Sequence, residues 1–481
     1  MEHQAAMQDG RLTSVRLIER FLERVEAYDR SGPRLNAVLE VNPQAREIAE
    51  TLDRERASGS IRGLLHGIPL LLKDNIATAD RLHTSAGSLA LKDCIAPRDA
   101  FLATRLREAG AVILGKANMT EWANFMTTGM PAGYSSRGGQ VKNPYGESLS
   151  PGGSSSGSAV AVAAGLCTVA VGTETSGSIL SPANWNSVVG VKPTLGLISR
   201  SGIVPIAASQ DTAGPFARTV ADAAILLGAM TGVDAADRAT RASRRHARGD
   251  YTESLSAKGL EGARLGVPRE VYFERLAAPE TPVMDAALRA LGNLGAVLVD
   301  PADIVTAREV SDFRSDVMLY EFKRDLNRYL QDLGEASPIR SLRALIRFNE
   351  GRPQEMLRFG QVLLLAAHAT SGLRTPTYRR SRAEDLRMSR ADGIDQVMKR
   401  ERLDALVFPG WSGAAIGAKA GYPSVIVPAG YTAEATPIGL TFLGRAWSEP
   451  TLLRLAHAFE TATSLRRAPP SVAPGPAGPP L

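Results

Sequence analysis

Two loops rich in glycine and serine contain the residues best suited to nucleophilic chemistry. The first covers residues 150–158 and the second covers residues 172–179. Both loops flank the same predicted helix and strand, so their hydroxyls and backbone N–H groups could meet at one point. A serine hydroxyl is a poor nucleophile at neutral pH and needs a base. The two loops therefore indicate serine-based acyl transfer, with several serines as candidates for the nucleophile.

A lysine is the base that this sequence offers. The chain has six histidines, and none of them lies in either loop. Lys73 directly follows an apolar run over 64–72, which predicts a buried strand. Burial disfavours the ammonium form, so an amine at this position can be neutral near pH 7 and can accept a serine proton. Lys73 is the predicted general base.

The elements that must position these groups alternate between helix and strand, which favours an α/β sheet. Residues 129–157 are rich in Gly, Ser, Pro and Asn and predict a long structured loop. Helices are predicted over 12–28 (with Thr13 or Ser14 as N-cap), 101–109, 159–165, 312–333 and 339–359, and buried strands over 64–72, 111–115, 168–171, 406–409, 424–428 and 438–443.

The chain of 481 residues is predicted to form one domain over 1–467. The helical segment 312–395 could cap the site or wall its entrance. The proline-rich tail 468–481 is predicted to be disordered, because proline supports neither a strand ladder nor a helix interior.

Composition excludes several other classes of protein. The net charge of +6 is small for this length, so nucleic-acid binding is not indicated. Cys94 and Cys167 are too few for a disulfide framework and lack metal-type spacing. No signal-peptide layout or long apolar run is present, so we expect a cytoplasmic protein that does not bind membranes, either a monomer or a homodimer.

An ordered series of motifs resembles the amidase signature family, and the resemblance covers most of the chain. Besides the two loops, the matching segments are Gly67-Ile68-Pro69, Lys73-Asp74-Asn75, residues 115–121, residues 189–194, Gly421-Tyr422-Pro423 and Gly439-Leu440. The resemblance implies an α/β amidase signature fold, in which helices cover both faces of a mixed, twisted sheet. It implies hydrolysis of amides, anilides or carbamates with no metal or organic cofactor, and a possible side activity as an esterase or urethanase.

The resemblance also assigns the catalytic groups. It implies a Ser-cisSer-Lys triad of Ser178 as nucleophile, Ser154 as proton relay and Lys73 as base, with a cis peptide bond before Ser154. A non-proline cis bond costs ~3 kcal/mol and persists only where the surrounding structure enforces it. The oxyanion hole implied by the family consists of the backbone N–H groups of Thr175, Ser176, Gly177 and Ser178.

Two residues depart from the common family pattern. Family members usually have aspartate and glycine at the positions of Glu174 and Ser176, and this variant resembles the peptide-amidase-like branch. The substrate pocket is expected to involve Phe125, Met126, Thr127 and Trp185, although a core role suits the apolar ones equally well. Asp74, Asn118 and Asp211 are candidates for a supporting polar network or for turns and caps.

The same motifs allow other interpretations. Residues 153–157 fit a nucleophile elbow, which would make Ser155 the nucleophile of an α/β-hydrolase with His368 or His457. Residues 110–116 nearly match a phosphate-binding loop but lack its Ser or Thr. A glutamine-hydrolysing subunit of a tRNA-dependent amidotransferase is the main alternative function. A binding protein without activity is a further one, disfavoured because all three triad positions are filled.

Overall fold

A computed structural model describes residues 1–313 and 315–472. Its centre is an eleven-stranded mixed sheet with the strand order β1-β3-β2-β6-β8-β7-β12-β13-β11-β9-β10. Strands β4 and β5 form a separate small hairpin. The strands are β1 (Val38–Val41), β2 (Pro69–Lys73), β3 (Val112–Ala117), β4 (Tyr134–Ser135), β5 (Gly139–Gln140), β6 (Val169–Glu174), β7 (Val189–Lys192), β8 (Thr212–Ala217), β9 (Arg264–Gly266), β10 (Val297–Val299), β11 (Ala405–Pro409), β12 (Ser424–Tyr431) and β13 (Pro437–Leu443).

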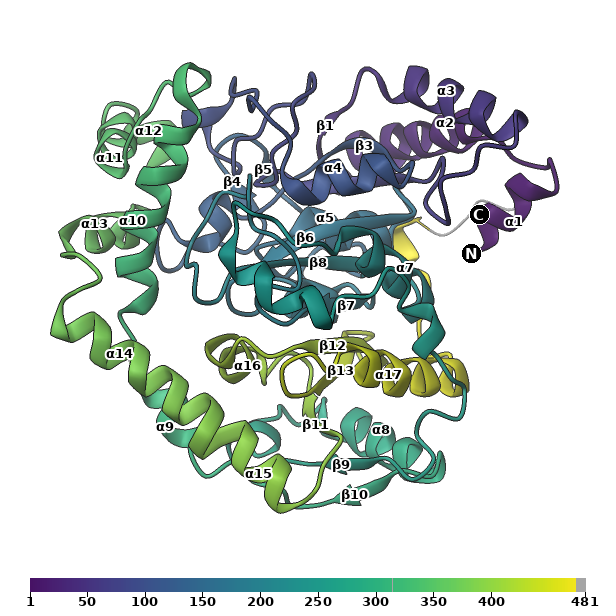
Figure 1. Ribbon diagram of the computed structural model, residues 1–481, viewed down its shortest axis with the longest axis vertical. Coiled ribbons are helices and arrows are strands. Elements are labelled where there is room, and N and C mark those ends of the chain that lie inside the picture. Colours follow the sequence, from purple (N-terminus) through teal and green to yellow (C-terminus); the bar gives the residue numbers. More distant parts are fainter. Residues whose placement is uncertain (314, 473–481) are drawn as a thin grey trace.

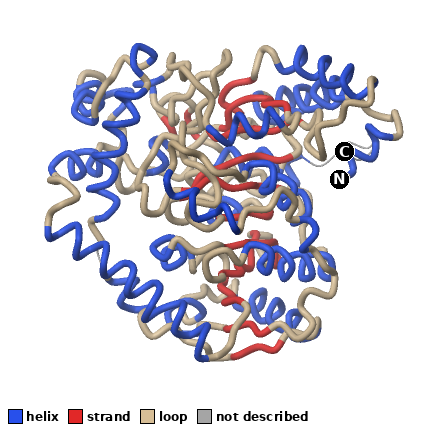
Figure 2. Tube along the Cα trace, viewed as in Figure 1, coloured by secondary structure: helices blue, strands red, loops and turns tan. Residues whose placement is uncertain are grey.

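Helices surround this sheet, as Figures 1 and 2 show. Helices α5 and α6 contact the central strands and each other, while α7, α8 and α17 form a second contacting group on the sheet. The helices are α1 (Glu2–Gln8), α2 (Ser14–Arg24), α3 (Ala45–Ala57), α4 (Phe101–Glu108), α5 (Ser156–Ala163), α6 (Leu180–Trp185), α7 (Val220–Met230), α8 (Thr281–Asn293), α9 (Ala307–Asp312), α10 (Val317–Asp332), α11 (Leu342–Glu350), α12 (Pro353–Met356), α13 (Val362–Ala369), α14 (Pro376–Leu386), α15 (Asp395–Arg400), α16 (Ala414–Ala420) and α17 (Glu449–Thr463). The α/β prediction is confirmed.

Strand β2 is central to the site because it delivers Lys73. It lies between β3 and β6 and runs parallel to both. All five of its residues are buried, which explains the apolar residues directly before Lys73. The strand predicted over 64–72 begins only at Pro69, because residues 64–67 form turns and Leu64 is exposed. The predicted N-cap at the first long helix is also observed, since the Thr13 side chain accepts a hydrogen bond from the Arg16 N–H.

Two further sequence predictions need correction. The helical pattern over 339–359 is two helices, because Pro353 has no N–H to donate and starts a new helix, α12, after α11 has ended. The predicted disorder from 468 is wrong for residues 468–472: the Ser471 hydroxyl donates to the Pro144 carbonyl at 2.7 Å, and Val472 is buried. Residues 473–481 of the predicted tail lie outside the described residues.

Besides the core around the central sheet, the described residues form a second hydrophobic cluster, and the helical segment predicted as a cap is part of it. Helices α10, α11 and α13 supply buried leucines to this cluster, and residues of the 86–130 region supply Trp122, Phe125 and Met126. In Figure 1 these helices stand along one side of the molecule, beyond the β4–β5 hairpin. Within the described residues, no helix is both long and apolar enough to cross a membrane.

Candidate active site

Lys73 and the second Gly/Ser loop lie at the same edge of the sheet. Strands β2 and β6 are parallel, with Leu72 paired to Val171, so both chains leave the sheet at this edge. Lys73 is the last residue of β2 and Glu174 is the last residue of β6. Ser154 precedes helix α5, which packs against both strands. The sheet therefore brings together segments that are 80 to 100 residues apart in the chain.

The Lys73 amine is held between Ser154 and Thr173. Its Nζ lies 2.8 Å from Ser154 Oγ, 2.9 Å from Thr173 Oγ1 and 3.3 Å from the Thr173 carbonyl oxygen. The Asn75 amide donates to the same Thr173 hydroxyl at 2.9 Å. A neutral amine has two N–H donors and one lone pair. The two N–H groups can point to the Thr173 oxygens, which leaves the lone pair facing Ser154.

Burial favours the neutral amine of Lys73. The side chain is fully buried, and desolvation lowers its pKa from the usual 10.5 to about 7. The negative charges of Glu174 and Asp211 oppose this shift and raise the pKa. The buried amine is thus close to half neutral at physiological pH, as a general base requires.

The loops that carry Ser154 and Ser178 are hydrogen-bonded to each other. The Gly153–Ser154 peptide bond is cis, as the family resemblance implied. The Ser154 carbonyl accepts from the Thr120 N–H at 3.0 Å, and the Ser155 N–H donates to the Ser178 carbonyl at 3.3 Å. Ser154 is fully buried, whereas Ser178 keeps 8% of its surface exposed. Of the two hydroxyl-bearing residues, Ser178 is therefore the one that a substrate can reach.

The turn before α6 presents a row of free backbone N–H groups. Within residues 1–313 and 315–472, no protein acceptor is found for the N–H of Thr175, Ser176, Gly177 or Ser178. Four adjacent donors without partners beside a reachable hydroxyl suit the stabilisation of an oxyanion. Gly177 has φ +83°, a backbone conformation that favours glycine, and a Cβ there would lie 3.2 Å from the Trp411 ring, a tight contact.

Glu174 anchors this turn to the start of helix α6 through two hydrogen bonds. Its Oε2 accepts from the Ile179 N–H at 2.7 Å and from the Leu180 N–H at 3.0 Å. Both N–H groups belong to the start of α6 and follow Ser178 directly. A carboxylate at a helix N-terminus also interacts favourably with the helix dipole. The glutamate that departs from the common family pattern therefore positions the Ser178 turn.

Asp211 and Gln210 hold the other end of the turn. Asp211 accepts from the Thr175 hydroxyl at 2.5 Å, and the Gln210 amide donates to the Thr175 carbonyl at 3.2 Å. The second Asp211 oxygen accepts from the N–H groups of Ile206 and Ala207, each at 2.8 Å. Burial raises the pKa of Asp211 to about 6, against the effect of these donors. Asp211 thus belongs to the predicted supporting network.

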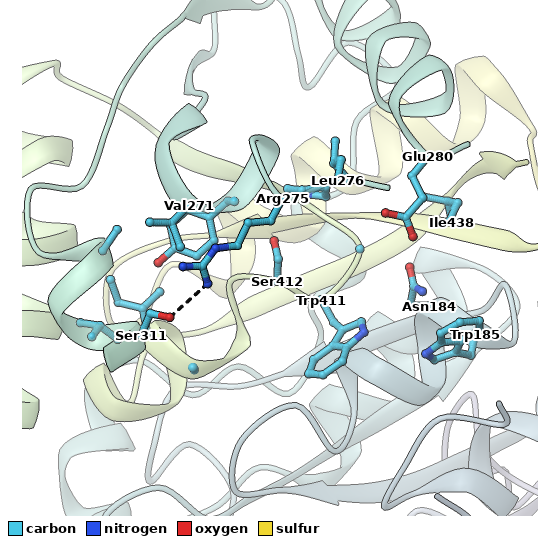
Figure 3. A pocket seen from close by; sticks show the side chains of 17 residues that line it. Asn184, Trp185, Val271, Arg275, Leu276, Glu280, Ser311, Trp411, Ser412 and Ile438 are labelled. Atoms are coloured by element: carbon cyan, nitrogen blue, oxygen red, sulfur yellow. Dashed lines mark hydrogen bonds between the residues drawn. The ribbon is translucent and has the colours of Figure 1, made fainter. Parts of the chain in front are cut away.

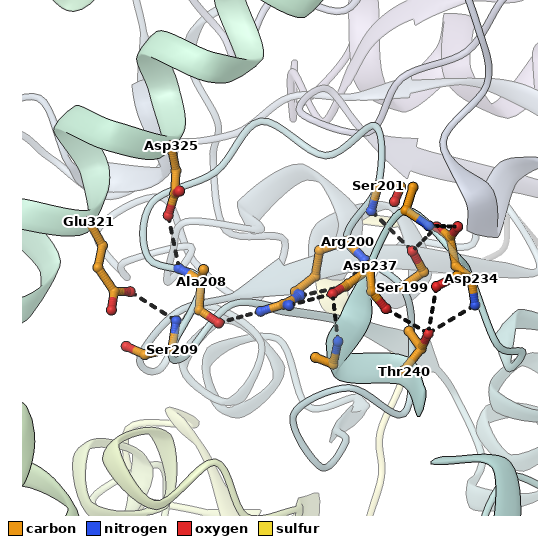
Figure 4. Close-up of polar contacts among 12 residues, drawn as sticks. Ser199, Arg200, Ser201, Ala208, Ser209, Asp234, Asp237, Thr240, Glu321 and Asp325 are labelled. Atoms are coloured by element: carbon orange, nitrogen blue, oxygen red, sulfur yellow. Dashed lines mark hydrogen bonds and ion pairs between the residues drawn. The ribbon is translucent and has the colours of Figure 1, made fainter. Parts of the chain in front are cut away.

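The 199–212 loop that carries Asp211 is itself anchored on two sides, as Figure 4 shows. On one side, Glu321 and Asp325 of α10 accept from the N–H groups of Ser209 and Ala208, at 2.9 Å and 3.3 Å. On the other side, the Arg200 guanidinium forms a bidentate ion pair with Asp237. The helical segment 312–395 therefore contacts the loop that supports Thr175.

The four residues predicted for the pocket separate into two groups. Trp185, at the end of α6, lines a cavity that also contains Trp411 (Figure 3). Phe125 and Met126 instead belong to the second hydrophobic cluster, where the Phe125 ring packs against Phe322 at a centroid distance of 4.9 Å. Thr127 is buried and donates to the Phe359 carbonyl at 3.0 Å.

The alternative motifs have structural roles. The Ser155 hydroxyl donates to the Thr173 carbonyl at 3.0 Å and accepts from the Thr173 N–H at 3.2 Å, so it supports the loop. Lys116 lies in strand β3, buried, where it donates to the Ile76 carbonyl and the Thr84 hydroxyl. Among the described residues, no group of three or more His, Cys, Asp or Glu could hold a metal ion.

Sequence reasoning missed three contributors to the site. Thr173, which binds the Lys73 amine, and Gln210 carry no signal apart from their position in a motif. Trp411 lies far along the chain from the two loops, and only folding brings its ring onto Gly177.

Comparison with known proteins agrees with this geometry. A family model described as Amidase matches residues 16–420. A probable amidase of Arabidopsis thaliana is 43% identical over 97% of this chain and 90% of its own length. The crystal structure of a peptide amidase from Stenotrophomonas maltophilia superposes with a TM-score of 0.92 at 48% identity, covering 97% of each chain. A glutamyl-tRNA(Gln) amidotransferase subunit of Halorhodospira halophila is 36% identical over 96% of both chains.

Proposed function

Because this chain belongs to the amidase family and hydrolyses amide C–N bonds, we propose that Ser178 is its nucleophile, with Ser154 and Lys73 as the groups that move protons. The observation that carries this proposal is the contact of 2.8 Å between the Ser154 hydroxyl and a buried amine whose pKa is about 7. A serine needs such a base to attack a carbonyl at neutral pH.

In the acylation step, Ser178 Oγ attacks the amide carbonyl carbon. Its proton passes to Ser154 as the Ser154 proton passes to neutral Lys73. The negative charge that forms on the carbonyl oxygen is stabilised by the N–H groups of residues 175–178. The C–N bond then breaks, and the leaving nitrogen takes a proton from Ser154, which recovers one from Lys73. Amine departure needs this protonation, because an amide anion is a very poor leaving group.

In the deacylation step, water enters in place of the amine and uses the same groups. It gives a proton to the Ser154–Lys73 pair and attacks the ester carbon of the acyl-Ser178 intermediate. The C–O bond to Ser178 then breaks, and Ser178 Oγ takes the proton back. The products are a carboxylic acid and the free enzyme.

The substrate class that we propose is a peptide whose C-terminus is a primary amide. The support is the 48% identity to proteins named peptide amidase, together with Glu174 and Ser176, the two departures that resemble the peptide-amidase-like branch. Esters and carbamates undergo the same acyl transfer, so side activity on them is part of the proposal.

Labelling of Ser178 tests the catalytic assignment. A serine-directed phosphonate should modify the wild-type enzyme at Ser178, and Ser178→Ala should lose both the label and amide turnover. Ser148→Ala removes an exposed surface serine and serves as the matched control. Turnover that survives Ser178→Ala would exclude this residue as the nucleophile.

The second candidate is a glutamine-hydrolysing amidotransferase subunit, favoured by the glutamyl-tRNA(Gln) amidotransferase relatives at 32–36% identity. Such a protein would release ammonia from glutamine for use on charged tRNA within a complex. The isolated chain would then hydrolyse glutamine in preference to peptide amides. Peptide-amide hydrolysis by the purified chain without glutaminase activity would eliminate this candidate.

A further inference from the structure

A cavity of about 370 Å³ has Trp411 in its wall, close to Gly177, the residue before the proposed nucleophile. Its near wall is Trp411, whose six-membered ring lies against Gly177. A second wall is the end of helix α6, which starts two residues after Ser178 and supplies Asn184 and Trp185. The cavity and the Ser178 turn therefore have Trp411 and helix α6 as shared neighbours, and Figure 3 shows the cavity side of both.

The walls of this cavity are largely apolar and aromatic. Trp411 is 43% exposed, an unusual state for a tryptophan that is not covered by a ligand or a partner. The remaining apolar residues come from four separate segments of the chain. They include Val271, Leu276, Val310, Ile416 and Ile438.

Asn184 and the two charged side chains at the cavity already have partners within the protein. The Asn184 carbonyl oxygen accepts from the Gly439 N–H at 2.8 Å, and Arg275 donates to Ser311 at 3.1 Å (Figure 3). Glu280 accepts from the Ala277 N–H at 3.1 Å. The two charged side chains have opposite sign, so the cavity does not select a ligand of either charge. Its chemistry suits an uncharged apolar group, and its size is at the lower end of the ~300–1,000 Å³ range of ligand pockets.

We propose that this cavity binds the large apolar side chain of the residue that carries the scissile amide. This inference rests on the proposed function. A primary amide releases only ammonia, so every large group of such a substrate belongs to the acyl part. The enzyme should therefore prefer C-terminal amides of aromatic or large aliphatic residues to that of glycine, and Trp411 is a specificity-determining residue.

The test compares two substrates, N-acetyl-phenylalaninamide and N-acetyl-glycinamide, and uses the ratio of their kcat/KM values. Loss of a well-packed apolar contact in a pocket changes kcat/KM by roughly 10–200-fold. We expect a wild-type ratio well above one and a fall of about 10-fold or more in Trp411→Ala.

A second variant avoids disturbing the Ser178 turn, which Trp411 contacts directly. Ala415→Trp fills the cavity from an exposed position on α16, and Ala366→Trp makes the same change at an exposed position on α13, away from the cavity. The ratio should fall in Ala415→Trp and stay at the wild-type value in Ala366→Trp.

A wild-type ratio near one, or an unchanged ratio in Ala415→Trp, would overturn the proposal. Phosphonate labelling of Ser178 in each variant separates this outcome from failure of the catalytic assignment. If Ser178 is labelled but the substrate preference is absent, the catalytic assignment stands and only the role proposed for the cavity is excluded.

Discussion

Replacing Glu174 by glutamine should shift the pH dependence of amide hydrolysis to lower pH. Glu174 is the largest of the charges that raise the pKa of Lys73 against the effect of burial. Only the neutral amine can act as a base, so activity is lost as the pH falls through the pKa of Lys73. Removing the carboxylate charge lowers that pKa and preserves the neutral amine in more acidic solution.

The size of the effect follows from the pKa of about 7 for Lys73. At pH 6.5 about a quarter of the amine is then neutral. Loss of one nearby charge shifts a pKa by roughly one unit, about 1.4 kcal/mol, which would leave about three quarters neutral. The activity of each enzyme at pH 6.5 is expressed as a fraction of its own plateau at high pH. This fraction should be roughly three-fold higher for Glu174→Gln than for the wild type.

Glutamine is the matched substitution because its side-chain oxygen can still accept from the Ile179 and Leu180 N–H groups. The assay is kcat/KM for a peptide amide between pH 6.5 and 9, which stays above the pKa of about 6 of Asp211. Glu23→Gln, at an exposed position on α2, controls for the loss of one negative charge. A profile that does not move, or that moves to higher pH, would refute the assignment of Lys73 as the titrating base.

Two further predictions concern the groups around Ser178. Lys73→Ala should lower amide kcat by ~10²–10⁴-fold, the usual contribution of a general acid–base group, and should lower ester kcat less, because an ester needs less protonation of its leaving group. Equal losses on a matched amide and ester pair would argue against the relay. Ser155→Ala should keep phosphonate labelling of Ser178 but lower the free energy of unfolding by ~1–3 kcal/mol, because it removes the side-chain acceptor of the buried Thr173 N–H and one of the two side-chain donors to the Thr173 carbonyl, the other being Lys73. Denaturant unfolding measures this change, and loss of labelling without loss of stability would instead favour Ser155 as nucleophile.

Much of the local structure could be predicted from the sequence. The apolar run before Lys73 predicted a buried strand correctly because β2 is covered on both faces, and the run at 424–428 predicted β12 for the same reason. Predictions were weaker where one residue interrupts a regular pattern. Pro353 divides a helical pattern into α11 and α12, and the proline-rich stretch from 468 is still held to the domain at Ser471.

The sequence places serines in two Gly/Ser loops and a lysine at the end of an apolar strand, and the family resemblance singles out Ser154, Ser178 and Lys73 among them as the proposed catalytic groups. These are properties of single residues and of near neighbours, so the order of residues can encode them. The surroundings of these residues are decided only by the folded chain. The depth of burial that lowers the pKa of Lys73, the support of Thr175 by Asp211, and the placement of Trp411 on Gly177 all depend on contacts between distant segments. Desolvation and packing are set by everything that encloses a group, and a single segment of sequence does not specify that enclosure.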